Sequence, residues 1–265
     1  MPHSFGLLAH ANNDAFTIFG FTVHWYGLII AVGLILALVL GYFNAPRRGY
    51  KRDDPFEWIL WVLPFAIIGA RLYFLIFNGG PWGWEAFAVW NGGLAVYGSI
   101  IGGAVGAVLY CGIRKRDFLA LADVAVPSLA LGQGIGRIGC YFGGCCYGIE
   151  VTDPSMQWFP FSVQIDGVWH YSTFFYESFF DLLICLALVL MLRKTNTRGI
   201  VFGAYLVLYG IVRALIEGIR GESLMLGSTG IRVSQLLSIL LVLAGIGVII
   251  WRVLTNKKQK QEVTQ

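Results

Sequence analysis

Residues 24–43 read HWYGLIIAVGLILALVLGYF, a run of 20 residues without a Lys, Arg, Asp or Glu. A helix needs about 20 mostly apolar residues to cross a bilayer, because each residue advances it by about 1.5 Å and the apolar core is about 30 Å thick. This stretch therefore predicts a transmembrane helix. It also supplies the template by which the rest of the chain is interpreted.

Six further stretches fit the same template. The whole chain is 57% hydrophobic and 13% charged, with a mean hydropathy of +0.69, which is too apolar for an average soluble domain. We predict an all-α, polytopic membrane protein with seven transmembrane helices in one integral-membrane domain, residues 1–265, and a disordered polar tail at 256–265. The predicted spans are 24–43, 56–77, 93–112, 119–142, 171–192, 200–219 and 232–253.

The basic residues predict the orientation of these spans. Fourteen of the 19 Lys and Arg form four short clusters, which follow the first, third, fifth and seventh spans. Because Lys and Arg concentrate on the cytoplasmic side of membrane helices, the N-terminus is expected outside and the C-terminus in the cytoplasm. The clusters are short and separate, so the net charge of +4 gives no indication of nucleic-acid binding.

The other five basic residues are all arginines, in or beside the spans: Arg71, Arg137, Arg213, Arg220 and Arg232. A charge within a span usually faces the bundle interior or a water-filled cavity, because exposure to lipid costs several kcal/mol. The guanidinium fork suits phosphate and carboxylate groups. The first three lie in the outer halves of their spans, which favours an anion-binding role. The last two lie at span ends, where snorkelling toward lipid headgroups is an equal alternative.

The sixth span carries polar residues on one helical face. Tyr209, Arg213, Glu217 and Arg220 follow spacings of four, four and three residues, which align them along a helix. This face has one more cation than anion, so one cation is available to a phosphate. Glu217 is expected to orient both arginines, and a role as a base is an alternative.

The densest motif closes the fourth span. Residues 132–148 read GQGIGRIGCYFGGCCYG. Glycines such as Gly136 and Gly139 leave the helix surface bare, which permits close packing or the close approach of a ligand headgroup. Packing would explain the glycines, but it would not explain Arg137 among them.

These residues resemble the prolipoprotein diacylglyceryl transferase family of bacterial inner membranes. The resemblance extends along nearly the whole chain. It is carried by His24-Trp25-Tyr26-Gly27, Gly69-Ala70-Arg71-Leu72, the run from Trp90 to Gly98, Gly136-Arg137-Ile138-Gly139, the run from His170 to Glu177, the triad Tyr209, Arg213 and Glu217, and Ser234-Gln235.

The resemblance implies a multi-pass enzyme of the bacterial inner membrane. Such an enzyme transfers the diacylglyceryl group of phosphatidylglycerol to the lipobox cysteine thiol of a prolipoprotein and releases glycerol phosphate, the first step of lipoprotein maturation. Its partners are that phospholipid, the prolipoprotein signal peptide and membrane lipids, and no metal or organic cofactor is implied. The expected catalytic residues are Arg137, Arg213, Tyr97 and Glu217. The expected substrate-binding residues are Tyr26, Arg71, Gly136, Gly139, Tyr209, Glu177 and Arg220.

Three positions depart from the usual family pattern. Tyr97 stands where the family usually has His, and Cys140 and Cys145 stand where it usually has Asn and Glu. A tyrosine with a pKa near 10 is a poor base at neutral pH. Glu177 or Glu217 is therefore an alternative base, and loss of activity is a further alternative.

The third cysteine of this segment, Cys146, adjoins Cys145. The three thiols are interpreted as small packing groups, a disulfide, a metal site with His170 as fourth ligand, or a reactive thiolate beside Arg137. Two alternative functions also stay open. One is a diverged paralogue that uses the same phospholipid with another acceptor, and the other is a non-catalytic membrane protein that binds anionic lipids.

Overall fold

The computed structural model describes residues 14–18, 21–80, 83–87, 92–221 and 232–264. Within these residues it has seven helices that are long and apolar enough to cross a membrane, as predicted. Each begins within three residues of its predicted span. They are α1 (Trp25–Asn44), α2 (Asp54–Asn78), α3 (Val96–Ile113), α4 (Phe118–Phe142), α5 (Thr173–Lys194), α6 (Ile200–Glu217) and α7 (Val233–Thr264).

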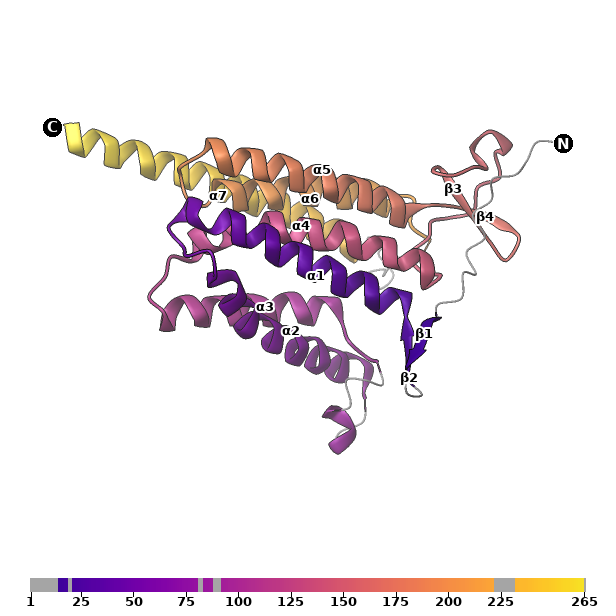
Figure 1. Ribbon diagram of the computed structural model, residues 1–265. Helices are drawn as coiled ribbons and strands as arrows, with labels where there is room; N and C mark the ends of the chain where they lie inside the picture. Colours follow the sequence, from indigo (N-terminus) through magenta and orange to yellow (C-terminus); the bar gives the residue numbers. More distant parts are fainter. Residues whose placement is uncertain (1–13, 19–20, 81–82, 88–91, 222–231, 265) are drawn as a thin grey trace.

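The helices lie side by side in two groups (Figure 1). In the first group α4 packs between α1 and α5, α5 packs on α6, and α6 packs on α7. In the second group α2 and α3 form a closely packed hairpin: a Cβ added at Gly98 would be 2.2 Å from the carbonyl oxygen of Gly69. Glycine is required there because the two backbones meet directly.

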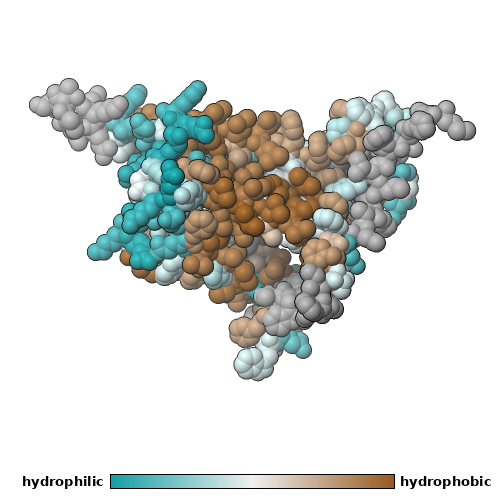
Figure 2. Space-filling model, viewed as in Figure 1, coloured by the Kyte–Doolittle hydropathy of each residue, from teal (hydrophilic) through white to brown (hydrophobic). Residues whose placement is uncertain are grey.

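The middle of the molecule is covered by exposed apolar side chains, which form a broad hydrophobic band (Figure 2). Leu60, Leu215 and Leu243 are each more than 60% exposed. In water such a surface would be very unfavourable, whereas lipid chains solvate it. Hydrophilic residues lie beyond the band (Figure 2), so the surface supports the multi-pass membrane interpretation.

The C-terminal tail differs from the prediction. We expected disorder over 256–265, but α7 continues to Thr264, and Gln265 lies outside the described residues. The tail has three Lys, three Gln and one Glu, which have good helix propensity. Adding residues to an existing helix avoids the unfavourable nucleation step, so the polar sequence extends the helix out of the apolar zone.

Two short hairpins lie at one end of the bundle (Figure 1). The first pairs β1 (Asp14–Ile18) with β2 (Phe21–His24), and the second pairs β3 (Ser162–Ile165) with β4 (Val168–Tyr171). The second hairpin was not predicted, although the Asp166-Gly167 turn marks it in the sequence. Both residues have positive φ, 49° and 84°, and an Asp-Gly pair is a strong hairpin signal for this reason.

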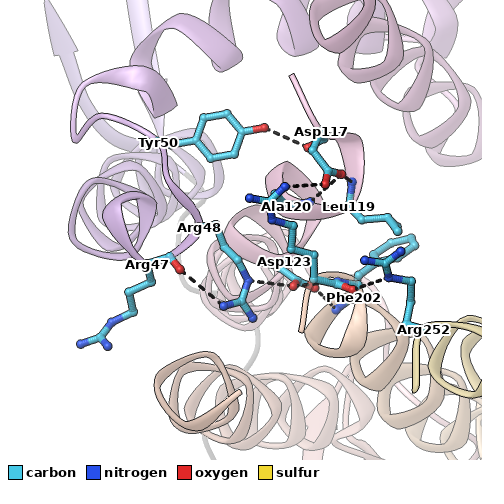
Figure 3. A network of polar contacts seen from close by, with 11 residues as sticks. Arg47, Arg48, Tyr50, Asp117, Leu119, Ala120, Asp123, Phe202 and Arg252 are labelled. Atoms are coloured by element: carbon cyan, nitrogen blue, oxygen red, sulfur yellow. Dashed lines mark hydrogen bonds and ion pairs between the residues drawn. The ribbon is translucent and has the colours of Figure 1, made fainter. Parts of the chain in front are cut away.

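A buried ion pair joins several helices at the opposite end of the bundle, and Figure 3 shows its contacts from close by. Nε of Arg48, just after α1, is 2.9 Å from Oδ2 of Asp123 on α4. The same carboxylate accepts hydrogen bonds from the amides of Gly199 and Phe202 at the start of α6. Arg48 belongs to the basic cluster that follows the first span, but its side chain is buried, and the pair fixes α1, α4 and α6 relative to one another.

Candidate active site

Glu177, near the start of α5, lies at the centre of a group of arginines. Its Oε2 is 2.5 Å from Nε of Arg137 on α4. Its Oε1 is 2.6 Å from Nη1 of Arg213 on α6 and 3.4 Å from Nη1 of Arg220. The ends of these helices meet beside the two hairpins (Figure 1). The fold therefore brings together four predicted site residues that lie far apart in the sequence.

The contacts along α6 agree only in part with the predicted face. Nη2 of Arg213 is 2.9 Å from Oε2 of Glu217, as a spacing of four residues predicts. The helix ends at Glu217 with Gly218 as its C-cap, so Arg220 leaves the helical face and contacts Glu177 instead. The expectation that Glu217 also orients Arg220 is wrong for this reason. Nη1 of Arg232 donates to the backbone carbonyl of Glu217.

The carboxylates of this cluster lie behind the arginines. The side chains of Glu177 and Glu217 are 7% and 1% exposed, whereas those of Arg137 and Arg213 are 25% and 17% exposed. A ligand approaching from outside therefore meets guanidinium groups first. Buried carboxylates hold these groups in place, which is the arrangement that an anion site needs.

One further carboxylate belongs to the cluster and was missed. Asp181 is buried one turn beyond Glu177 on α5, within electrostatic reach of Glu177, Arg137 and Arg213. The cluster then has four arginines against three carboxylates, an excess of one basic group. The arginines are Arg137, Arg213, Arg220 and Arg232, and the carboxylates are Glu177, Asp181 and Glu217. A carboxylate inside the predicted span 171–192 was the signal that could have identified Asp181.

Two predicted tyrosines lie beside the cluster. Tyr209 on α6 stacks on Tyr205 with ring centroids 5.5 Å apart and is within electrostatic reach of Arg137 and Arg213. Tyr26, at the start of α1, packs over Gly139, where an added Cβ would be 3.1 Å from Cδ2 of the ring. The glycine therefore provides the space that the tyrosine occupies.

Gly136 faces a different environment. An added Cβ there would have no atom within 4 Å. The residue lines a cavity of about 480 Å³ whose walls are mainly apolar side chains of α1, α2 and α4, among them Ile30, Leu34 and Val62. Gly136 directly precedes Arg137 on α4, so the cavity lines the same part of this helix from which the arginine of the cluster extends.

Arg71 is not part of that cluster in the described residues. It is buried, and its guanidinium donates to four backbone carbonyls of the segment that joins α2 to α3. Nε donates to Ala86, Nη2 to Glu85, and Nη1 to Gly92 and Gly93, at 2.8 to 3.2 Å. These contacts give Arg71 a role in holding this segment, and the predicted contact with substrate stays a prediction.

Residues 13–251 match the sequence profile of the prolipoprotein diacylglyceryl transferase family. The chain belongs to this family. It is 39% identical over 260 residues to phosphatidylglycerol–prolipoprotein diacylglyceryl transferase 1 of Clostridium perfringens (strain 13 / Type A), covering 95% of this chain and 98% of that protein. The resemblance found in the sequence is thus confirmed, and the chain is an enzyme of the bacterial inner membrane.

Two further relatives carry the same name without a number. One, from Clostridium botulinum (strain Loch Maree / Type A3), is 40% identical over 242 residues, covering 89% of this chain and 94% of that protein. The other is from Oceanobacillus iheyensis (strain DSM 14371 / CIP 107618 / JCM 11309 / KCTC 3954 / HTE831). It is 38% identical over 244 residues, covering 87% of this chain and 84% of that protein. The similarity therefore extends over more than four fifths of this chain and of each relative.

Tyr97 is the family position where this chain departs from His. Its ring lies near that of Tyr73 on α2, with centroids 6.2 Å apart, so the described contacts place it in the α2–α3 hairpin. Trp90 and Asn91, which begin the motif around it, lie outside the described residues. Its predicted role as a base stays a prediction.

The cysteines at the other two departing positions, Cys140 and Cys145, gather with Cys146 beside the arginines. The Sγ atoms of Cys140, Cys145 and Cys146 all lie within 4.8 Å of one another. Nη1 of Arg137 and Nη2 of Arg220 each lie 3.7 Å from Sγ of Cys146. Hydrogen bonds from the other two thiols, aided by the arginines, hold the pKa of Cys146 well below its ordinary value.

Proposed function

We propose that this protein transfers the diacylglyceryl group of phosphatidylglycerol to the lipobox cysteine thiol of a prolipoprotein and releases glycerol phosphate. Family membership supports this reaction, as do the names of relatives that align with nearly the whole chain. The observation that carries the proposal is the convergence of Arg137, Arg213 and Arg220 on Glu177.

The arginine cluster is the proposed site of the lipid phosphate. Arg137 and Arg213 present partly exposed guanidinium groups, and the carboxylates of Glu177 and Glu217 hold them from behind. Fixed cations suit a phosphodiester whose leaving phosphate gains charge as the C–O bond breaks. Tyr26 and Tyr209 border this site and would position the headgroup.

The apolar cavity beside Gly136 is the proposed site of an acyl chain. Its volume of about 480 Å³ and its lining of Ile, Leu and Val side chains suit hydrocarbon. A lipid with its tail in this cavity would have its headgroup next to Arg137. This arrangement joins the two chemical parts of a phospholipid in one site.

The bonding changes of the proposed transfer balance without a redox step. The acceptor sulfur loses its proton and forms a bond to the glycerol carbon that carries the phosphate. The C–O bond at that carbon breaks, and its electron pair leaves on the phosphate oxygen. Arg137 and Arg213 would stabilise this oxygen, since guanidinium groups bind phosphate through paired donors. The proposed orientation places this end outside and the C-terminus in the cytoplasm.

Complementation tests the proposal directly. The protein would be expressed in bacterial cells depleted of their own transferase, and the mobility of a reporter prolipoprotein would be followed on gels. We expect the lipid-modified form to return, and an Arg213→Ala variant present at equal abundance in the membrane not to restore it. A well-expressed, membrane-inserted protein that leaves the reporter unmodified would sink the proposed function.

A further inference from the structure

The turn after α4 brings three thiols to one point. Cys140 is on the last turn of the helix, and the amide of Cys145 donates back to its carbonyl oxygen at 3.1 Å. Gly144 and Cys146 have positive φ, 59° and 62°. This conformation is unfavourable for a cysteine. The chain nevertheless adopts it, and it directs Cys146 toward the other two sulfurs, which all lie within 4.8 Å.

The spacing of the sulfurs suits a tetrahedral metal. Zinc–sulfur bonds of about 2.3 Å place the sulfurs of a tetrahedral site about 3.8 Å apart, so shifts on the order of 1 Å would close the group on an ion. A disulfide would use two of the three thiols, whereas a metal uses all three. Three protein ligands with an open fourth position are typical of catalytic rather than structural zinc.

One side of the three-thiol group opens onto a cavity. His170, the fourth ligand considered from the sequence, has its Nδ1 3.1 Å from the carbonyl oxygen of Gly148 and its ring against Tyr147. Cys145 is exposed and lines a cavity of about 390 Å³ together with Tyr26 and Gly143. An incoming ligand therefore reaches the thiols through this cavity.

The charge around the thiols also suits zinc. Three thiolates around Zn²⁺ carry one net negative charge, which nearby cations stabilise. Arg137 and Arg220 each place an Nη atom 3.7 Å from Sγ of Cys146. Donors to coordinating sulfurs are a usual second layer of zinc sites. The same two arginines contact Glu177, so the thiols adjoin the proposed phosphate site.

We propose that Cys140, Cys145 and Cys146 bind a zinc ion whose open position takes the acceptor thiol of the transfer reaction. This proposal rests on the proposed function and deepens it. The acceptor thiol gives its proton to solvent as its sulfur binds the zinc, because coordination deprotonates a thiol outright. The zinc-bound sulfur then attacks the glycerol carbon, forming the C–S bond while the C–O electron pair leaves on the phosphate oxygen beside Arg137.

Zinc solves a specific chemical difficulty of this reaction. A free cysteine with a pKa near 8.5 is only about 3% ionised at pH 7, so its nucleophilic form is scarce. The ring of Tyr97, the expected base, lies beside the ring of Tyr73 on α2. A metal next to the phosphate site would instead supply the acceptor as a thiolate at the place where it reacts.

Metal analysis of the purified full-length protein tests the site without using activity. After incubation with zinc and gel filtration in detergent, we expect about one zinc per chain. The triple variant Cys140→Ser, Cys145→Ser, Cys146→Ser should lose it, and the matched Cys185→Ser control on α5 should keep it. Both variants must elute from gel filtration as single peaks. The single variant Cys145→Ser, at the exposed position, should also lose zinc, and it carries less risk to folding. Zinc-free wild type, or copper(I) bound in preference to zinc, would overturn the site.

Cobalt substitution tests the open position. Co²⁺ in a three-thiolate site should show sulfur-to-cobalt charge-transfer absorption, and a lipobox peptide should increase it as a fourth sulfur binds. The same peptide with Cys→Ser should leave the spectrum unchanged. No response to the cysteine peptide would overturn the acceptor role. Transfer in the complementation test by the triple cysteine-to-serine variant would overturn the zinc proposal alone, whereas zinc binding by the wild type without any transfer would overturn the proposed function.

Discussion

Nε of Arg137 lies 2.5 Å from Oε2 of Glu177, so the arginine of the glycine-rich motif is held in place before any substrate binds. An unpaired arginine near a membrane would be free to turn toward lipid headgroups. Pairing it with a buried carboxylate fixes the guanidinium plane. Because Glu177 also contacts Arg213 and Arg220, one side chain orients three cations.

The first prediction concerns this carboxylate. Glu177→Ala should lower kcat/KM for diacylglyceryl transfer by about 100-fold, since a displacement of 1 Å in a catalytic group can have this effect. Glu177→Gln keeps an acceptor oxygen and should lose roughly tenfold. Glu150→Gln, an exposed position outside the cluster, is the matched control. Wild-type kinetics for Glu177→Ala would contradict the orienting role.

The second prediction concerns the two proposed phosphate ligands. Arg137→Ala and Arg213→Ala should each lower transfer by roughly 100- to 1,000-fold, the usual cost of removing one donor from a site that stabilises developing charge. The corresponding Lys variants keep the charge but lose the planar fork, so they should recover only part of the rate. Arg193→Ala, in an exposed basic cluster, should leave transfer unchanged. Retained activity in either alanine variant would refute the phosphate assignment.

The third prediction separates Arg71 from these residues. Arg71→Ala removes four hydrogen bonds to backbone carbonyls between Glu85 and Gly93, so amide hydrogen exchange in this segment should become faster. Arg137→Ala should not change exchange there. Unchanged exchange in Arg71→Ala together with weaker binding of phosphatidylglycerol would instead favour the substrate-binding role expected from the sequence.

Hydropathy was enough to predict all seven helices, because the bilayer imposes a length and a composition on each span. It could not predict where α7 ends, since lipid no longer constrains the chain beyond the apolar zone and helix propensity decides. The Arg213–Glu217 contact followed from helical spacing alone. The contact of Arg220 with Glu177 did not follow from this spacing, because the helix ends at Glu217 and the chain then changes direction.

Contacts between elements that are distant in the sequence could not be predicted from sequence patterns. Nothing in the spacing of Arg137, Glu177 and Arg213 indicates that one carboxylate would join them, because this depends on how α4, α5 and α6 pack. The clustering of Cys140 with Cys145 and Cys146 was visible in the sequence, but the positive φ of Cys146 that brings the sulfurs together was not. The buried partner of Arg48, Asp123, was marked only by being an acid inside a span.

The fourth prediction is a pH dependence at Asp117, the N-cap of α4. Burial acts to raise its pKa, but hydrogen bonds from Arg198 and from the amides of Ala120 and Leu119 outweigh it, so the pKa is lowered. A lowered folded pKa contributes stability above the unfolded value, near 3.9, that is lost as the pH falls through the folded value. Asp117→Asn keeps the cap and removes the charge.

Thermal unfolding in detergent measures this effect. Asp117→Asn should be slightly less stable than wild type at pH 7, by less than about 1 kcal/mol for so exposed a pair. The difference should shrink below about pH 4 as the wild-type carboxylate protonates. Asp117→Ala should lose more at both pH values, because the cap is lost as well. A difference between Asn variant and wild type that is independent of pH would rule out the charge as its cause.

The fifth prediction concerns the buried pair of Arg48 and Asp123. Asp123→Ala leaves a buried guanidinium without its carboxylate and two amides of α6 without their acceptor (Figure 3). Breaking such a pair should lower the free energy of unfolding by about 3–5 kcal/mol. The double variant Arg48→Met, Asp123→Ala removes the unpaired charge as well, so it should recover part of this loss.

Thermal midpoints in detergent give the coupling between the two positions. Because the pair lies at the opposite end of the bundle from Glu177, the protein that remains folded should keep its kcat/KM. Additive effects of the two substitutions would show that the ion pair itself contributes nothing to stability.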